Sequence, residues 1–149
     1  MKSTVPISAV LRQKGHKVYA LPPNASVYSA VELMALRSAG ALLVMEGETI
    51  TGIVSERDYA RKVILLGKSS RETPIRDIMT SPVYTVTPSD NIADVMRLMT
   101  ERRIRHVPVV ENEYVVGVVS IGDLVKWIVT EQEQTIEELH SYIAGSYPR

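Results

Sequence analysis

The chain has 149 residues, with 17 basic and 17 acidic side chains, and its formal net charge is therefore zero. This balance argues against bulk electrostatic attraction to nucleic acid or to an anionic membrane. The absence of cysteine excludes disulfides, thiolate chemistry and cysteine-based metal sites. Because no apolar run is as long as a membrane span, and residues 1–6 lack an apolar signal core, we expect a cytoplasmic protein.

The first half of the chain predicts a leading helix, a short strand, a helix, a hairpin of two strands and a closing helix. The residues that mark these elements are Ile7, Val10 and Leu11 for the leading helix, 18–21 for the strand, 22–24 for the turn, and 41–45 and 49–54 for the hairpin. Gly47 suits a hairpin position with positive φ, and Ser55 opens the closing helix.

The second half predicts the same elements in the same order. Their marks are Ile75, Ile78 and Met79 for the leading helix, 83–86 for the strand, 87–90 for the turn, Ile92, Val95, Met96 and Met99 for the helix, and 106–110 and 114–119 for the hairpin. Asn112 suits the turn, and Ser120 opens the last helix. Since the strands are too apolar for a half-exposed sheet, we expect both of their faces to be covered.

The two halves are a sequence repeat, because residues 19–64 align without a gap on residues 84–129 at a constant offset of 65. Twelve of these 46 positions are identical, where ordinary composition would give roughly three. We therefore predict an α/β (α+β) fold in which two pseudo-symmetric α-β-α-β-β-α repeats pack through their sheets into one module. The expected segments are the first repeat at 7–66, a linker at 67–74, the second repeat at 75–130 and a helical tail at 131–149. Such packing creates two related clefts, where small ligands bind.

The tail has no counterpart in the first repeat. Thr135 and Glu138 match a capping box, which predicts that a separate helix starts there. The apolar stripe of this helix and the residues that end it are Ile136, Leu139, Ile143, Gly145 and Pro148. Two interpretations stay open: the helix folds back on its own module, or it stabilises a dimer.

Two motifs of the pattern Gly, two apolar residues, Ser, two variable residues, Asp occur at 52–58 and 117–123. The segment Arg105-His106-Val107-Pro108-Val109-Val110 precedes the second motif by one hairpin. This arrangement resembles a tandem pair of cystathionine-β-synthase (CBS) domains, often called a Bateman module, of the stand-alone prokaryotic type with two repeats. The resemblance covers the chain from about Ile7 to Thr130.

The resemblance implies a non-catalytic regulatory module that senses energy or redox state by binding AMP, ADP, ATP, NAD or S-adenosylmethionine between the repeats. It also implies a homodimer, a flat disc of four repeats, that can act on a protein partner. A ligand-independent adaptor is the first alternative. A nucleotide enzyme is the second, although no nucleophile and base lie at suggestive spacing. We expect no metal site, because His16, His106 and His140 are scattered in sequence, and no nucleic-acid partner.

Ser55 with Asp58, and Ser120 with Asp123, have two interpretations. Each pair is a helix N-cap with an acidic residue at the third helical position. By resemblance, each Asp also accepts hydrogen bonds from a ribose diol, and each Ser lies near the ribose or phosphate. The other positions that the resemblance assigns to the ligand are Arg57, Arg105 and His106 for phosphate, Val107 and Pro108 for adenine through their backbone, and Lys17, Tyr19, Tyr84 and Thr85 around the adenine.

The two clefts are expected to be chemically unequal. The basic cluster of the second repeat ends in Arg105 and His106, whereas the matching positions of the first repeat are Gly40 and Ala41. We expect Arg102, and Arg37 at the matching position, to be solvated at the end of a helix. The clefts therefore differ in affinity, or one is empty, or each draws on residues of both repeats.

Overall fold

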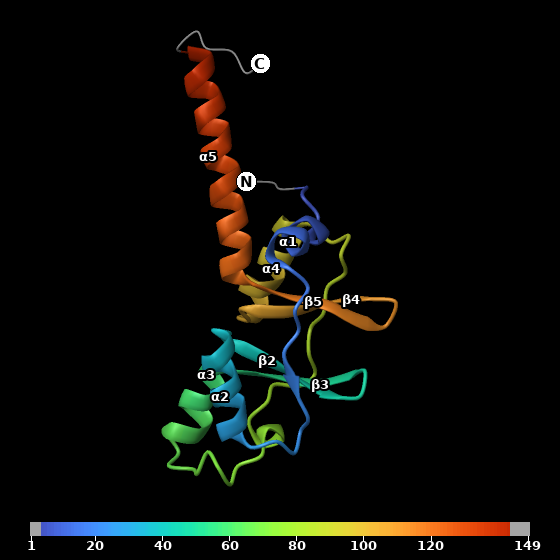
Figure 1. Ribbon diagram of the computed structural model, residues 1–149, viewed down its shortest axis with the longest axis vertical. Helices are drawn as coiled ribbons and strands as arrows, with labels where there is room; N and C mark the ends of the chain where they lie inside the picture. The colour runs from blue at the N-terminus through green and yellow to red at the C-terminus, as the bar shows by residue number, and fades with distance from the viewer. Residues whose placement is uncertain (1–3, 144–149) are drawn as a thin grey trace.

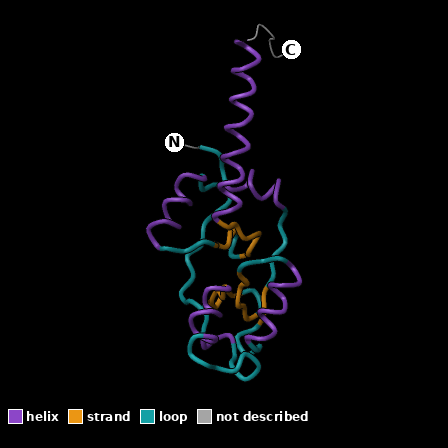
Figure 2. The backbone as a smooth tube through the Cα atoms, turned by 90° about the vertical axis from the view of Figure 1, so that its left-hand side faces the viewer, coloured by secondary structure: helices purple, strands orange, loops and turns teal. Residues whose placement is uncertain are grey.

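The computed structural model of the chain describes residues 4–143. Its strands lie in the middle in two groups, one above the other, and helices surround them (Figures 1 and 2). One long helix extends away from the body at one end (Figure 1). The predicted α/β architecture of two related repeats is confirmed.

Each repeat is built on an antiparallel hairpin. The strands of the first sheet and the helices that accompany them are β1 (Ala20–Leu21), α2 (Val27–Arg37), β2 (Ala41–Glu46), β3 (Thr49–Ser55), α3 (Glu56–Tyr59) and the π-helical turn η1 (Ala60–Ile64). Those of the second are α4 (Ile92–Arg102), β4 (His106–Glu111), β5 (Tyr114–Ser120) and α5 (Ile121–Ile143). Two leading elements precede them, α1 (Ile7–Lys14) and the 3₁₀ turn η2 (Ile75–Asp77). As predicted, Gly47 and Asn112 adopt positive φ in the hairpin turns.

The strand predicted at 83–86 is reduced to one bridge, in which Val86 lies parallel to Val109. In the first repeat the Leu43 N–H donates to the Tyr19 carbonyl at 3.1 Å. The matching residue of the second repeat is Pro108, which has no N–H to donate. The ladder therefore lacks that bond, and a regular first strand does not form.

The leading segments are exchanged between the repeats, which the sequence did not indicate. Helix α1 packs in the core of the second repeat, where Ile7 and Leu11 belong to the same buried cluster as Ile92 and Val119. The η2 turn packs in the core of the first repeat through Ile75. Figure 1 shows α1 in the same half of the molecule as β4 and β5, with the chain then descending to the first repeat. The segment 7–66 is thus a repeat in sequence but not a separate unit in space.

The first glycine of each motif permits this exchange. A β-carbon added at Gly117 would lie 2.6 Å from Leu11 Cδ2, so the Leu11 side chain would have to move. The same addition at Gly52 would collide with the Sδ of Met79, beside η2. Both glycines face the leading segment of the other repeat, so the absence of a side chain is a packing requirement.

Helix α5 is continuous from Ile121 to Ile143, so the separate tail helix was a wrong prediction. Thr135 is not an N-cap; its Oγ1 donates to the Glu131 carbonyl at 3.1 Å, as in a helix interior. Residues 127–134 contain neither Gly nor Pro, and nothing stops the helix there. Ile136 and Leu139 are 65% and 57% exposed, so the helix does not fold back on its module. Gly145 and Pro148 lie outside the described residues.

Among the helices of residues 4–143, none combines the length and the apolar character that crossing a bilayer requires.

Candidate functional site

A cavity of about 390 Å³ lies between the two repeats. Its size falls within the range of small-molecule sites. Residues of both repeats line it, namely Lys14, Gly15, Lys17, Tyr19, the run from Arg37 to Leu43, Ile53, His106, Val118, Ser120 and Asp123. Residues of both repeats therefore contribute to this one cavity.

Asp123 completes a capping box at the start of α5. The Ser120 N–H donates to Asp123 Oδ2 at 2.8 Å, and the Asp123 N–H donates to Ser120 Oγ at 3.1 Å. The cap orients the carboxylate at the helix N-terminus, where a negative charge is stabilised. Burial alone raises the pKa of Asp123, but the hydrogen bonds from Lys14 and Ser120 outweigh it and lower that pKa below its ordinary value. Asp123 is therefore ionised near neutral pH.

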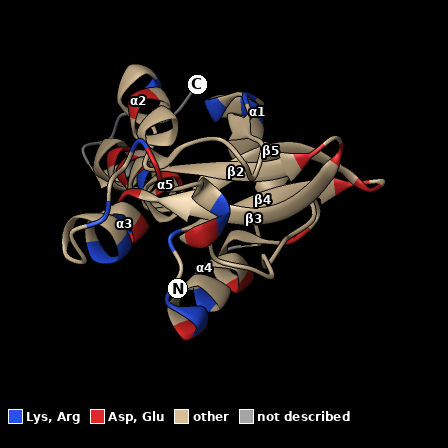
Figure 3. Cartoon of the chain, turned by 90° about the horizontal axis from the view of Figure 1, so that it is seen from below, with Lys and Arg blue, Asp and Glu red and all other residues tan. Residues whose placement is uncertain are grey.

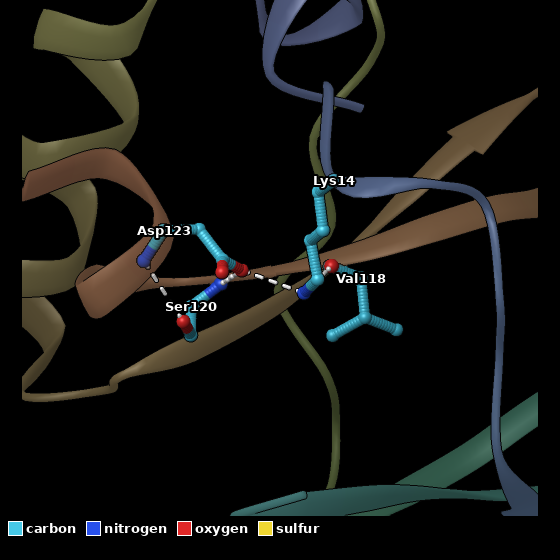
Figure 4. A network of polar contacts seen from close by, with 4 residues as sticks. All are labelled: Lys14, Val118, Ser120 and Asp123. Carbon is cyan, nitrogen blue, oxygen red and sulfur yellow. Dashed lines mark hydrogen bonds and ion pairs between the residues drawn. The ribbon is translucent and has the colours of Figure 1, made fainter. Parts of the chain in front are cut away.

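Lys14 is the second partner of this carboxylate (Figure 4). Its ammonium lies 2.6 Å from Asp123 Oδ2 and also donates to the Val118 carbonyl at 2.6 Å. Lys14 is the last residue of α1, so the exchanged leading helix delivers this cation to the cavity. The pair is half-exposed, and the lysine can change partners at small cost.

His106 lies at the contact between the repeats, at the start of β4. A β-carbon at Gly40 would lie 3.3 Å from its ring, so the imidazole of the second repeat packs directly on the backbone of the first. Burial, followed by the nearby charges of Lys14 and Arg105, lowers the pKa of His106, and Asp123 opposes this only in part. The imidazole is therefore neutral at neutral pH and able to gain a proton when an anion arrives.

Two further cations line the cavity, Lys17 and Arg37. The Arg37 guanidinium lies 5.5 Å from the centre of the Tyr19 ring, a cation–π distance. Arg102 and Tyr84 repeat this pair at 5.0 Å. Both arginines are exposed at the last position of their helices, as expected, and each also lies over an aromatic ring. With Lys14 paired to Asp123, Lys17 and Arg37 make the cavity suited to an anion.

The first repeat has the same capping box with a different cation. Asp58 Oδ2 accepts from the Ser55 N–H at 2.9 Å, and the Asp58 N–H donates to Ser55 Oγ at 3.2 Å. Asp58 Oδ1 lies 3.1 Å from Lys62 Nζ, four residues further along the same closing segment. Lys62 also donates to the Ile78 carbonyl at 2.9 Å. None of these residues lines the 390 Å³ cavity.

The predicted site residues divide into two groups. The cavity is lined by Lys17, Tyr19, His106, Ser120 and Asp123. It is not lined by Ser55, Arg57, Asp58, Tyr84, Thr85, Arg105, Val107 or Pro108. Val107 is fully buried in the core of the second repeat, so any role there belongs to the strand backbone. Arg105 is exposed, and its carbonyl accepts from the Ile121 N–H.

Two charged residues that line the cavity were not predicted, Lys14 and Arg37. The exchange of the leading helix brings Lys14 to Asp123, 109 residues away, and no local pattern indicates that contact. Arg37 could have been found, because the Tyr19–Arg37 and Tyr84–Arg102 pairs are identities of the repeat.

The surface carries charges of both signs. Figure 3 shows acidic residues at the tips of both hairpins and basic residues on α1, α3 and α4, without one dominant patch. Within residues 4–143 no group of three or more His, Asp or Glu side chains is placed to hold a metal ion.

The family model of the CBS domain matches the chain twice, at residues 11–64 and 75–130. The chain belongs to the CBS domain family. It is 40% identical to the CBS domain-containing protein CBSX3, mitochondrial, of Arabidopsis thaliana, over 95% of this chain and 73% of the relative.

Solved structures of CBS proteins have the same fold. A protein with CBS domains from Burkholderia ambifaria MC40-6 superposes with a TM-score of 0.82 at 45% identity, over 85% of this chain and 96% of that one. The CBS domain protein PAE2072 from Pyrobaculum aerophilum, solved as a complex with AMP, gives 0.71 at 28% identity over 80% and 89%.

Proposed function

We propose that this CBS pair is a non-catalytic regulatory module that binds AMP, ADP, ATP or NAD in the cavity between its repeats. The observation that carries the proposal is that Asp123, an ionised acceptor, shares one cavity with Lys17 and Arg37. A carboxylate can accept hydrogen bonds from both hydroxyls of a ribose, and guanidinium and ammonium groups bind phosphate. The AMP complex of the Pyrobaculum relative supports the same ligand class.

The Lys14 ammonium donates to Asp123 Oδ2, which is the oxygen that would accept hydrogen bonds from the ribose. A ribose diol displaces the ammonium, which then pairs with a phosphate in the same cavity. His106 gains a proton as the phosphate approaches, since an anion stabilises the imidazolium. Apolar side chains such as Leu43 and Ile53 cover the adenine. Because Lys14 ends the exchanged helix, this change of partners links the ligand to the packing between the repeats.

We further propose that the module works as a homodimer whose two halves change their angle when the ligand binds, and so report energy or redox state to a protein partner. The ligand shifts this angle only to the extent that it prefers one arrangement. A cytoplasmic location stays a prediction from composition.

The alternative is an adaptor that binds a protein without any ligand. The observation in its favour is that both motif carboxylates already have partners, since Asp58 and Asp123 each serve a capping box and a lysine. The two functions differ in whether the cavity takes up adenosine compounds.

The test is a panel of AMP, ADP, ATP, NAD and 2′-deoxy-AMP, measured by native mass spectrometry and isothermal titration calorimetry. The proposal expects one ligand per cavity and a loss of about 1–3 kcal/mol for the 2′-deoxy compound, which lacks one hydroxyl for Asp123. Equal binding of AMP and 2′-deoxy-AMP would contradict the role of Asp123. No binding of any member would favour the adaptor, and cleavage of ATP or NAD on prolonged incubation would contradict a non-catalytic module.

A further inference from the structure

Helix α5 presents an apolar stripe that no part of the described chain covers. Its members are Val125, Val129, Ile136, Leu139 and Ile143, which are 44%, 46%, 65%, 57% and 83% exposed. Together with the exposed Gln132 they form the α5 stripe: Val125, Val129, Gln132, Ile136, Leu139, Ile143. Single exposed apolar residues are ordinary, but an ordered row along a helix marks an interaction surface.

The spacing of the α5 stripe is 4, 3, 4, 3, 4 residues, a strict heptad repeat. A period of 3.5 is the pattern of a coiled-coil seam, whereas a helix that packs on a globular core follows 3.6. The stripe begins on the body, at Val125, and continues for about 27 Å along the helix. The buried face of α5 is a separate one, formed by residues such as Ile121 and Leu124.

We infer that the partner of this stripe is a second copy of the chain, whose α5 pairs with it in a parallel two-stranded coiled coil. The a positions, Val129, Ile136 and Ile143, are all β-branched, and Leu139 occupies a d position. β-branched residues at a with Leu at d favour two parallel strands; the a positions follow this rule throughout, and Leu139 follows it among the d positions Val125, Gln132 and Leu139. Gln132 also lies at a d position, so the parallel register places it opposite Gln132 of the second copy.

The flanking charges favour the parallel orientation. In the parallel pair, Glu133 at an e position faces Ile128 of the second copy, and His140 faces Thr135. In the antiparallel pair that overlaps the whole stripe, Glu133 instead faces Glu133 of the second copy, which is unfavourable. The acidic residues Glu131, Glu137 and Glu138 occupy b and c positions, away from the seam in either case.

A seam of about three heptads is short for an isolated coiled coil, because a free helix must first be nucleated. In this chain the packing of α5 on the second repeat replaces that nucleation step. Leu124 is fully buried in the second core, and the capping box of Ser120 and Asp123 fixes the first turn of α5. The helix therefore extends from an anchored start, and the two bodies add contacts at Val125 and Val129. The inference deepens the homodimer part of the proposed function and requires no ligand.

The test exploits the absence of cysteine from the chain. Leu139→Cys places one thiol at a d position, where parallel helices bring the two α-carbons within disulfide reach. Gln134→Cys, on the outer face of the same helix, is the matched control. Mild oxidation at low protein concentration is expected to convert Leu139→Cys, but not Gln134→Cys, to a covalent dimer. An uncrosslinked Leu139→Cys, or equal crosslinking of both variants, would overturn the inference.

Sedimentation equilibrium provides a second readout on the native chain. Ile136→Asp is expected to raise the dimer dissociation constant at least tenfold, and Gln134→Asp to leave it unchanged. Both positions lie outside the two cores, so the body folds in either variant. A wild type that stays monomeric at tens of micromolar, or an unchanged constant for Ile136→Asp, would overturn the inference. Neither result depends on nucleotide binding, so failure of the coiled coil and failure of the proposed function are separable.

Discussion

The two Ser-x-x-Asp motifs have the same sequence pattern and the same capping box, yet their carboxylates have different surroundings. Asp58 pairs with Lys62 of its own closing segment, and its side chain is 14% exposed. Asp123 pairs with Lys14 of the exchanged helix, and its side chain is 24% exposed. The residue that matches Lys62 in the second repeat is Trp127, so the second repeat has no lysine at that position. A motif therefore fixes where a helix starts, but the distant chain decides whether its carboxylate faces a cavity.

The strongest test of this difference is a pair of substitutions, Asp123→Asn and Asp58→Asn. Removing the charge at Asp123 is expected to weaken AMP binding by about 1.5–3 kcal/mol, roughly 10- to 150-fold, because a hydrogen bond to a charged acceptor is lost. Asp58→Asn alters the matching cap and is expected to change affinity less than about twofold. Calorimetric titration measures both. Equal losses in the two variants would mean that both clefts bind ligand alike.

The motif glycines offer a comparison of stability. Gly117→Ala forces a β-carbon against Leu11 and is expected to lower the free energy of unfolding by about 1–3 kcal/mol. Gly52→Ala acts in the same way against Met79, whose flexible side chain yields more easily, so its cost is expected to be smaller. Urea denaturation gives both values, with Gly47→Ala in the hairpin turn as a control for backbone strain alone. A Gly117→Ala protein as stable as wild type would contradict the packing described for α1.

Lys14 and Lys62 can be compared by replacing each with Met. Adenosine carries the diol but no phosphate, so it reports on Asp123 without the attraction of cations for phosphate. Lys14→Met is expected to bind adenosine roughly two- to fivefold more tightly, because a half-exposed ion pair of up to about 1 kcal/mol no longer has to be broken. The pKa of Asp123, followed by NMR, is expected to rise, since the Lys14 hydrogen bond lowers it.

The matched control, Lys62→Met, is expected to leave adenosine binding unchanged, because Lys62 pairs with Asp58 instead. Weaker adenosine binding by Lys14→Met would show that Lys14 assists the diol rather than competing with it.

The smallest expected effect concerns pH. Burial lowers the pKa of His106, so the free protein holds a neutral imidazole. The proposed function predicts that a bound phosphate makes this imidazole charged. Binding thus takes up a proton, and affinity is expected to rise about twofold or more as pH falls from 8 to 6.5. His106→Gln removes this dependence and also corrects for titration of the phosphate itself. A parallel pH profile in the two proteins would exclude His106 from the phosphate contact.

Much of the fold could be predicted from the sequence, because residues that are close together in the chain specify the elements of each repeat. The hairpins, the helix starts at Ser55 and Ser120, and the turn position of Asn112 depend on neighbouring residues alone. The shortened strand at 83–86 also has a cause in the sequence, the missing N–H of Pro108. Pro108 lies on β4, however, so residues 83–86 themselves do not indicate the change.

The cavity was predicted less completely because it depends on contacts between distant segments. Asp123, Ser120 and Tyr19 were found from motif and repeat, and the structure places them together. Lys14 was missed, because which repeat receives the leading helix is decided by packing on Gly117 and not by the residues around Lys14. The extent of α5 was missed because a capping-box pattern at Thr135 has no effect inside a helix that has already started.

The exchange of leading segments also bears on how such a chain can be divided. The core of each repeat is completed by a segment that the other repeat supplies, Ile7 to Leu11 in one direction and Ile75 in the other. A chain with one repeat would expose that gap and could fill it only with the leading segment of another chain. The smallest self-sufficient unit is therefore two repeats, whether they come from one gene or two. Joining them in a single polypeptide turns an intermolecular association into an intramolecular one and removes its dependence on protein concentration.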